Sequence, residues 1–207
     1  MFEKVRPDEI EKRSFEIISA ELEEKRIELD AVNAPVIKRC IHTSADFEYA
    51  ETLSFSEDAV GRMKEMIRGG ATIVTDTNMA LAGINKKKLS AFGASATCFM
   101  ADEEVMAEAE KRGMTRAAVS MEKASRLNGD VIFAIGNAPT ALIRLHEMME
   151  EGIFTPKFII GVPVGFVNVV AAKELFLKSD VPHIINAGRK GGSNIAAAIC
   201  NAVLYDM

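Results

Sequence analysis

Short apolar runs alternate with helical patterns along most of the chain. From residue 56 onward, helical segments separate five β-rich runs: ATIVTD (71–76), SATCFM (95–100), DVIFAIG (130–136), KFIIGVP (157–163) and PHIINAG (182–188). Continuous apolar stretches such as VIFAI are typical of strands that are covered on both faces. The pattern therefore predicts an α/β fold, with a mainly parallel five-stranded sheet in a three-layer α/β/α sandwich.

The N-terminal segment predicts a further helix over residues 7–25. Pro7 suits the first turn of this helix, and the acidic residues that follow suit the positive end of its dipole. Ile10, Ile17 and Ile18 share one face, and Ser14 lies in the middle of that apolar stripe. A serine in this position either bonds back to the carbonyl one turn earlier or has a functional role.

Composition narrows the class of protein. A chain of 207 residues suits a single domain over 1–207, and 48% hydrophobic with 27% charged residues is ordinary for a soluble globular protein. The net charge of −5 argues against non-specific binding of nucleic acid. No apolar stretch is long enough to span a membrane, and the charged N-terminus does not resemble a signal peptide, so we expect no membrane association and a cytoplasmic location.

Metal chemistry has no support in the sequence. The three cysteines are widely spaced and form neither a CxxC pair nor a Cys-His ligand pattern. A small odd number of cysteines fits reduced thiols in a cytosolic protein.

Ligands of open α/β sheets bind beyond the carboxyl ends of the strands, where this chain has glycine-rich turns. The richest is GRKGGSN (188–194), which combines Arg189 and Lys190 with three glycines and a serine, Ser193, that can cap the following helix. It is an anion site in outline. An ordinary turn with solvated cations explains it equally well, and neither a P-loop pattern nor GxGxxG is present.

The turn GVPVGFVN (161–168) is unusual because it is apolar where polar loops are expected. Val162, Val164, Phe166 and Val167 fall at the predicted sheet edge. An apolar patch in this position indicates a ligand surface or a subunit interface.

One of the three histidines stands out. His42 lies in KRCIHTSADFEY (38–49), outside the regular alternation, whereas His146 is expected on a helix surface and His183 at the start of a buried strand. No neighbouring ligand makes His42 a metal site, and no G-x-S-x-G elbow supports a hydrolase. An imidazole titrates near neutral pH, so His42 is either a proton donor or acceptor or an ordinary polar residue.

Six blocks in this order give the chain a family resemblance. They are EKRSFEII, IHTSADFEYA, ATIVTDTNMALAGI, GNAPTALIRL, GVPVGFVNVVAAKE and GRKGGSNIAAAICNA. Together they resemble the precorrin-8X methylmutases of cobalamin biosynthesis, also called precorrin isomerases or cobalt-precorrin-8 methylmutases. The resemblance implies a flavodoxin-like layout, and a homodimer that holds its tetrapyrrole substrate near the subunit interface. It implies an isomerase that needs no cofactor and moves a methyl group from C-11 to C-12 of precorrin-8X or cobalt-precorrin-8, giving hydrogenobyrinic or cobyrinic acid.

The resemblance also suggests roles for individual residues. His42 would be the acid or hydrogen-bond donor to the ring C nitrogen, and Ser14 resembles the active-site serine of the family. The remaining candidates would bind the substrate and its carboxylates: Arg13, Arg39, Thr43, Arg116, Arg189 and Lys190. We expect Asp46 and Glu48 to support the loop after His42.

Two other functions remain open from the residues alone. A non-catalytic corrinoid carrier would use the same anion-rich pocket. A phosphate- or nucleotide-binding α/β enzyme would use GRKGGSN alone.

Overall fold

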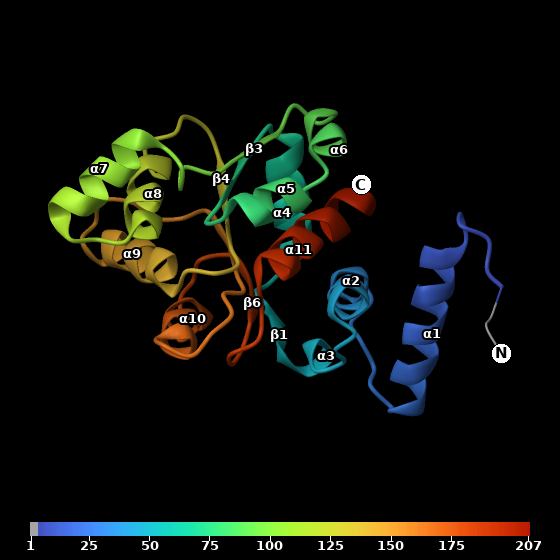
Figure 1. Ribbon diagram of the computed structural model, residues 1–207. Coiled ribbons are helices and arrows are strands. Elements are labelled where there is room, and N and C mark those ends of the chain that lie inside the picture. Colours follow the sequence, from blue (N-terminus) through green and yellow to red (C-terminus); the bar gives the residue numbers. More distant parts are fainter. Residues whose placement is uncertain (1–3) are drawn as a thin grey trace.

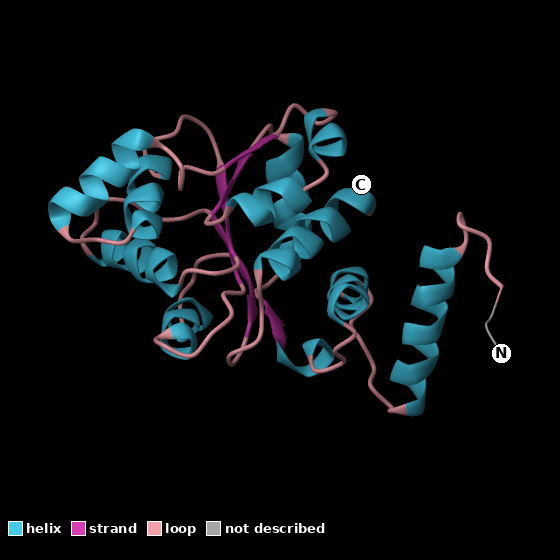
Figure 2. Cartoon of the chain, in the orientation of Figure 1, coloured by secondary structure: helices cyan, strands magenta, loops and turns pink. Residues whose placement is uncertain are grey.

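A six-stranded sheet runs through the centre of the computed structural model, which describes residues 4–207 (Figure 1, Figure 2). Its strands are β1 (Leu53–Phe55), β2 (Thr72–Thr75), β3 (Ser95–Thr97), β4 (Val131–Ile135), β5 (Phe158–Gly161) and β6 (His183–Asn186). They lie in the order β1-β6-β5-β4-β2-β3, and β2 to β6 are all parallel. All five strands expected from the apolar runs are therefore present.

The order of the parallel strands confirms the expected flavodoxin-like fold class. Numbered among themselves along the chain, β2 to β6 lie in the order 2-1-3-4-5, which is that of flavodoxin-like sheets. The direction of winding reverses between β2 and β4. The carboxyl ends of all five strands meet at one edge of the sheet, called the carboxyl edge below.

The sixth strand, β1, differs from the expectation of five strands. It pairs antiparallel with β6, with Leu53 opposite Asn186 and Phe55 opposite Ile184. The segment has only three residues, so it shows no period-2 pattern. Pairing with the free edge of β6, rather than local sequence, makes it a strand.

The described part of the chain contains eleven helices. They are α1 (Ile10–Glu24), α2 (Ala34–Ser44), α3 (Tyr49–Thr52), α4 (Ala59–Arg68), α5 (Asn78–Gly83), α6 (Lys86–Ser90), α7 (Glu103–Arg112), α8 (Arg116–Ala124), α9 (Pro139–Glu150), α10 (Val169–Leu177) and α11 (Ser193–Tyr205). Helices α8, α9 and α10 cover one face, and α4, α5 and α11 cover the other, with α2 against α11 (Figure 1). Within residues 4–207 no helix combines the length and apolarity that a membrane span requires.

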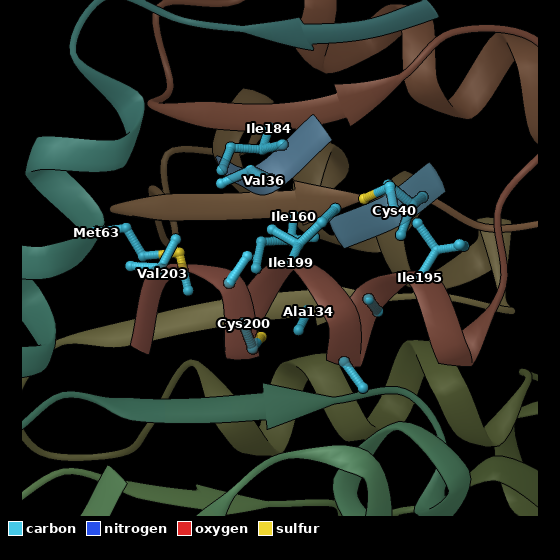
Figure 3. Close-up of a cluster of buried hydrophobic side chains, with 14 of the residues drawn as sticks. Val36, Cys40, Met63, Ala134, Ile160, Ile184, Ile195, Ile199, Cys200 and Val203 are labelled. Atoms are coloured by element: carbon cyan, nitrogen blue, oxygen red, sulfur yellow. The ribbon is translucent and has the colours of Figure 1, made fainter. Parts of the chain in front are cut away.

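Alternate residues of each central strand feed two separate cores. In β4, Ile132 and Ala134 face the core beneath α11, whereas Phe133 and Ile135 face the core beneath α8 to α10. Figure 3 shows the first core, where α11 residues pack against strand residues such as Ile160. Burial on both faces explains why these strands read as continuous apolar runs.

Residues 34–44 form a helix, α2, although the sequence placed them in a connection outside the alternation. Val36, Ile37, Cys40 and Ile41 are buried at the i, i+1, i+4, i+5 spacing of one helix face. Cys40 and Val36 lie in the core of Figure 3. Two cations separate the two buried pairs, and polar residues follow them, so the apolar spacing is hard to recognise in the sequence.

Helix α1 packs on the outside of α2 and stands apart from the sheet (Figure 1). It begins at Ile10, so Pro7 lies in the turn before the helix and not in its first turn. Of the expected apolar stripe only Ile18 is buried, while Ile10 is 54% and Ile17 is 40% exposed. The stripe therefore faces outward over most of its length.

Candidate active site

The His42 side chain lies in the last turn of α2 and is exposed. Its ring stacks on Phe15 of α1, with 5.3 Å between ring centroids and 16° between the ring planes. No residue of the described chain hydrogen-bonds to either ring nitrogen. The stacking orients the ring, and both nitrogens are left to meet a ligand.

The chain turns sharply after His42. Ala45 adopts the left-handed conformation (φ 53°), and its N–H donates to the Ile41 carbonyl at 2.7 Å, which closes the helix. Asp46 then accepts the Glu48 N–H at 3.0 Å. The Thr43 hydroxyl bonds back to the Arg39 carbonyl at 2.8 Å. This turn brings the carboxylates of Asp46 and Glu48 to the end of α2.

The loop after β6, residues 188–192, is held against the end of β5. The Gly192 N–H donates to the Val162 carbonyl at 2.9 Å, and the Gly165 N–H donates to the Arg189 carbonyl at 3.1 Å. A Cβ at Gly191 would lie 2.0 Å from the Val162 oxygen, and φ there is +155°. Glycine is required because the two backbones touch.

Lys190 joins the two motifs. Its Nζ lies 2.5 Å from an oxygen of Asp46 and 2.7 Å from an oxygen of Glu48. The hydrogen bond from Lys190 is the main cause that lowers the pKa of Asp46, and the two carboxylates raise the pKa of Lys190. The stretch that carries His42 and the loop GRKGGSN therefore form one polar surface, and the contact of Asp46 and Glu48 with Lys190 was not expected from the sequence.

Arg189 is the loop cation without an ion-pair partner among the described residues. Its guanidinium lies 5.4 Å from the ring centroid of Phe166. Phe166 is 81% and Val167 is 78% exposed, and Val164 beside them is also exposed, so most of the apolar patch expected in GVPVGFVN is present at the carboxyl edge. Val162, expected in the same patch, is instead fully buried in the core. A cation and an open apolar surface lie together here.

Ser193 has a different role from the expected helix cap. The cap position of α11 is Gly192, and Ser193 is the first helical residue. Its hydroxyl lies 2.7 Å from the Thr77 hydroxyl, which follows β2. The serine thus ties the start of α11 to the segment that follows β2.

Asp76 is a buried carboxylate at the carboxyl edge to which the sequence assigned no role. It accepts the N–H groups of Gly136, Asn137 and Ala138 at 2.9, 2.8 and 2.6 Å. Burial raises the pKa of Asp76, and the three N–H bonds oppose that shift. Asp76 thereby fixes the turn between β4 and α9. The position of Asp76 directly after β2 is the feature of the sequence that could have identified this residue.

Three other candidates, on α1 and α2, already have partners within the chain. Arg39 lies between the rings of Phe15 and Tyr205, at 4.7 and 5.2 Å, and its guanidinium is 2.6 Å from Glu11. The Ser14 hydroxyl donates to the Ile10 carbonyl at 3.0 Å, which is the ordinary structural role. Arg13 lies 3.5 Å from Glu16.

Arg116 lies at the other end of the carboxyl edge. It begins α8 and donates to the Met100 carbonyl, beyond β3, at 3.4 Å. Four strand spacings separate β3 from β6, a distance of about 19 Å. The chain therefore does not bring Arg116 next to Arg189.

The surroundings of the remaining histidines and of two cysteines indicate structural roles for these residues. His183 is buried as expected, with Nδ1 2.7 Å from the Val181 carbonyl. His146 packs edge-on against Phe176 and is half-buried, not on the surface as expected. Burial raises the pKa of Cys40 and Cys200 to about 12, which keeps both thiols protonated and unreactive at neutral pH.

A separate cavity of about 800 Å³ lies between α9 and α10. It is lined by His146, Met149, Leu175 and Pro182, among others. Pro182 precedes β6, so this cavity is at the amino end of the strands, away from His42 and Arg189.

Known proteins of one family are similar to this chain over nearly its whole length. A family model described as precorrin-8X methylmutase matches residues 9–206. A cobalt-precorrin-8 methylmutase of Priestia megaterium is 41% identical over 96% of this chain and 88% of its own length. Another from Salmonella typhimurium is 41% identical over 97% and 96%. A crystal structure of the precorrin-8X methyl mutase from Thermus thermophilus superposes with a TM-score of 0.85 at 37% identity, covering 95% of this chain and 94% of that one.

Proposed function

The chain belongs to the precorrin-8X methylmutase family, and on that premise we propose that it catalyses methyl migration from C-11 to C-12 of a corrin precursor in the cytoplasm. It is an isomerase of cobalamin biosynthesis, and the substrate is precorrin-8X or cobalt-precorrin-8. The Priestia and Salmonella relatives are both named for the cobalt substrate, so that form is the first to test.

One observation carries the proposal for the site. His42 has a ring oriented by Phe15, and both its nitrogens are free of partners in the described chain. A proton donor for a ring nitrogen needs this combination of fixed orientation and open access. The exposed Phe166, which lies beside Arg189, and Val167 offer apolar surface for a macrocycle.

The proposed reaction requires little more from the protein than a positioned acid. Protonating or hydrogen-bonding the ring C nitrogen withdraws electron density from the conjugated system, which eases migration of the methyl group. The rearrangement leaves the atoms and the oxidation state of the molecule unchanged, so we expect turnover without a cofactor. A positioned acid contributes on the order of 100- to 10,000-fold.

We propose Arg189 as the leading carboxylate partner, because its guanidinium is the loop cation without an acidic partner in the described chain. The Lys190 ammonium would bind a substrate carboxylate in addition to the carboxylates of Asp46 and Glu48. Arg39 would exchange Glu11 for substrate, and Ser14 and Thr43 would turn from backbone carbonyls toward it. Arg13 and Arg116 are more remote candidates.

We also propose a homodimer with the substrate near the subunit interface. Exposed apolar residues on α1 and at the carboxyl edge support this: Ile10, Ile17, Phe166 and Val167. A second copy would cover them and enclose a substrate that one chain leaves open. Light scattering during size exclusion tests the oligomeric state, and a mass of one chain at micromolar concentration would contradict it.

The activity test uses purified protein with precorrin-8X and with its cobalt form, in parallel. We expect a change in the absorption spectrum with no change in ligand mass. A non-catalytic carrier would return the ligand unchanged. A nucleotide-binding enzyme would instead show a thermal shift with nucleotides and none with corrinoids.

A further inference from the structure

Lys173 is an unusual residue in α10, because its side chain is fully buried in an otherwise largely apolar helix. Its exposed fraction is 0%, and it is among the largest fully buried side chains of the described residues. It forms no ion pair within residues 4–207, although buried lysines are normally paired. Burial lowers the pKa of Lys173 to about 8. An apolar residue of the same length would avoid the cost of removing an ammonium from water, so a role in stability alone does not explain a lysine at this position.

The partners of Lys173 are two carbonyls of one loop. Its Nζ donates to the Gly188 oxygen and to the Lys190 oxygen, both at 2.8 Å. Asn186 also donates to the Lys190 oxygen, at 2.9 Å. Since the carbonyl of Arg189 accepts from Gly165, three consecutive carbonyls of this loop point toward the protein.

This arrangement decides where the N–H groups of the loop point. The peptide bonds are trans, so each N–H points opposite to the carbonyl of the same peptide. Holding the Gly188 and Lys190 carbonyls inward turns the N–H groups of Arg189 and Gly191 outward. No residue in the described part of the chain accepts a hydrogen bond from either N–H. Both N–H groups belong to the same loop as the Arg189 guanidinium.

We propose that Lys173 is a positioning residue for substrate recognition: it holds residues 188–191 so that the N–H groups of Arg189 and Gly191 receive a carboxylate of the substrate. This inference rests on the proposed function. Lys173 does not touch the substrate, and the groups that bind it are backbone N–H groups beside Arg189. The site therefore binds the carboxylate with backbone N–H groups as well as with a cation.

The test compares Lys173→Met with Lys178→Met. The control lies on the same helix, but its ammonium is exposed and bonds only to Glu174, at 3.3 Å. We expect Lys173→Met to raise KM about 10- to 100-fold with kcat nearly unchanged, because hydrogen bonds to a charged group are lost and the reacting centre is untouched. Lys178→Met should keep both wild-type values.

A second measurement separates positioning from general loss of structure. The affinities of wild type and both variants are measured for hydrogenobyrinic acid and for its methyl ester. The preference of wild type for the acid should fall about 10-fold or more in Lys173→Met and persist in Lys178→Met. Wild-type KM and acid preference in Lys173→Met would overturn the proposal, whereas inactive wild type would instead contradict the proposed function.

A folding check completes the design. Circular dichroism and thermal melting verify each variant, and Lys173→Gln, which keeps a donor for one carbonyl, replaces a Met variant that does not fold. We expect the Gln variant to show an intermediate KM. Failure of both variants to fold would count against a positioning role, since the ammonium would then serve stability.

Discussion

Lys190 and Asp46 are 144 positions apart in the chain, and their side chains form an ion pair of 2.5 Å. The pair connects the loop after β6 to the turn that follows His42. Glu48 adds a second carboxylate at 2.7 Å. The proposed proton donor and the proposed carboxylate loop thereby belong to one surface, which neither motif could form alone.

Asp46→Asn tests this connection through pH. The pKa of Asp46 is lower in the folded state than its ordinary value, so the pair stabilises the fold fully above that ordinary value, about pH 4. Its contribution is lost as pH falls through the folded-state pKa. We expect the melting temperature of Asp46→Asn to lie below wild type at pH 7, and the difference to vanish in acid. The same difference at both pH values would contradict the assignment.

His42→Ala is expected to lower kcat by about 100- to 10,000-fold, because the positioned acid is removed. The ring is exposed and contacts Phe15 by stacking, so the fold and product affinity should change little. Turnover and product titration measure the two effects separately. His146→Gln is the matched control, since it lies on α9 at the other cavity. Wild-type kcat in His42→Ala would remove this residue from the mechanism.

Arg189→Met should raise KM about 10-fold or more and leave kcat nearly unchanged. The guanidinium is proposed to bind a substrate carboxylate away from the migrating methyl, so its loss weakens ground state and transition state alike. Steady-state kinetics with either substrate form measures this. Arg126→Met, an exposed arginine near α8, provides the control. An equal rise of KM in both variants would show that only overall charge matters.

Asp76→Ala should lower the free energy of unfolding by about 2 to 4 kcal/mol, because it leaves the buried N–H of Gly136 and two partly buried N–H groups without their acceptor. Denaturant unfolding measures the change. Asp180→Ala, which removes an exposed carboxylate, should stay within about 0.5 kcal/mol of wild type. A small effect at Asp76 would mean that water replaces the carboxylate.

The sequence was a good guide to the parallel sheet and to the turns at its carboxyl edge. Continuous apolar runs predicted β2 to β6, and turn-forming residues after those runs marked the carboxyl edge. The same reasoning missed β1, which is three residues long and depends on pairing with β6. It also missed α2, whose buried residues are separated by two cations and followed by polar residues.

The candidate site, like the fold, could be predicted from the sequence only in part. The residue types of KRCIHTSADFEY and GRKGGSN indicated proton transfer and anion binding, because those chemistries belong to the side chains themselves. Only the tertiary structure decided that Lys190 meets Asp46, that Lys173 bonds the loop carbonyls, and that Arg39 meets Glu11. A local pattern records which groups a segment offers. Which partner each group finds depends on how segments far apart in the chain pack together, and no window of sequence contains that information.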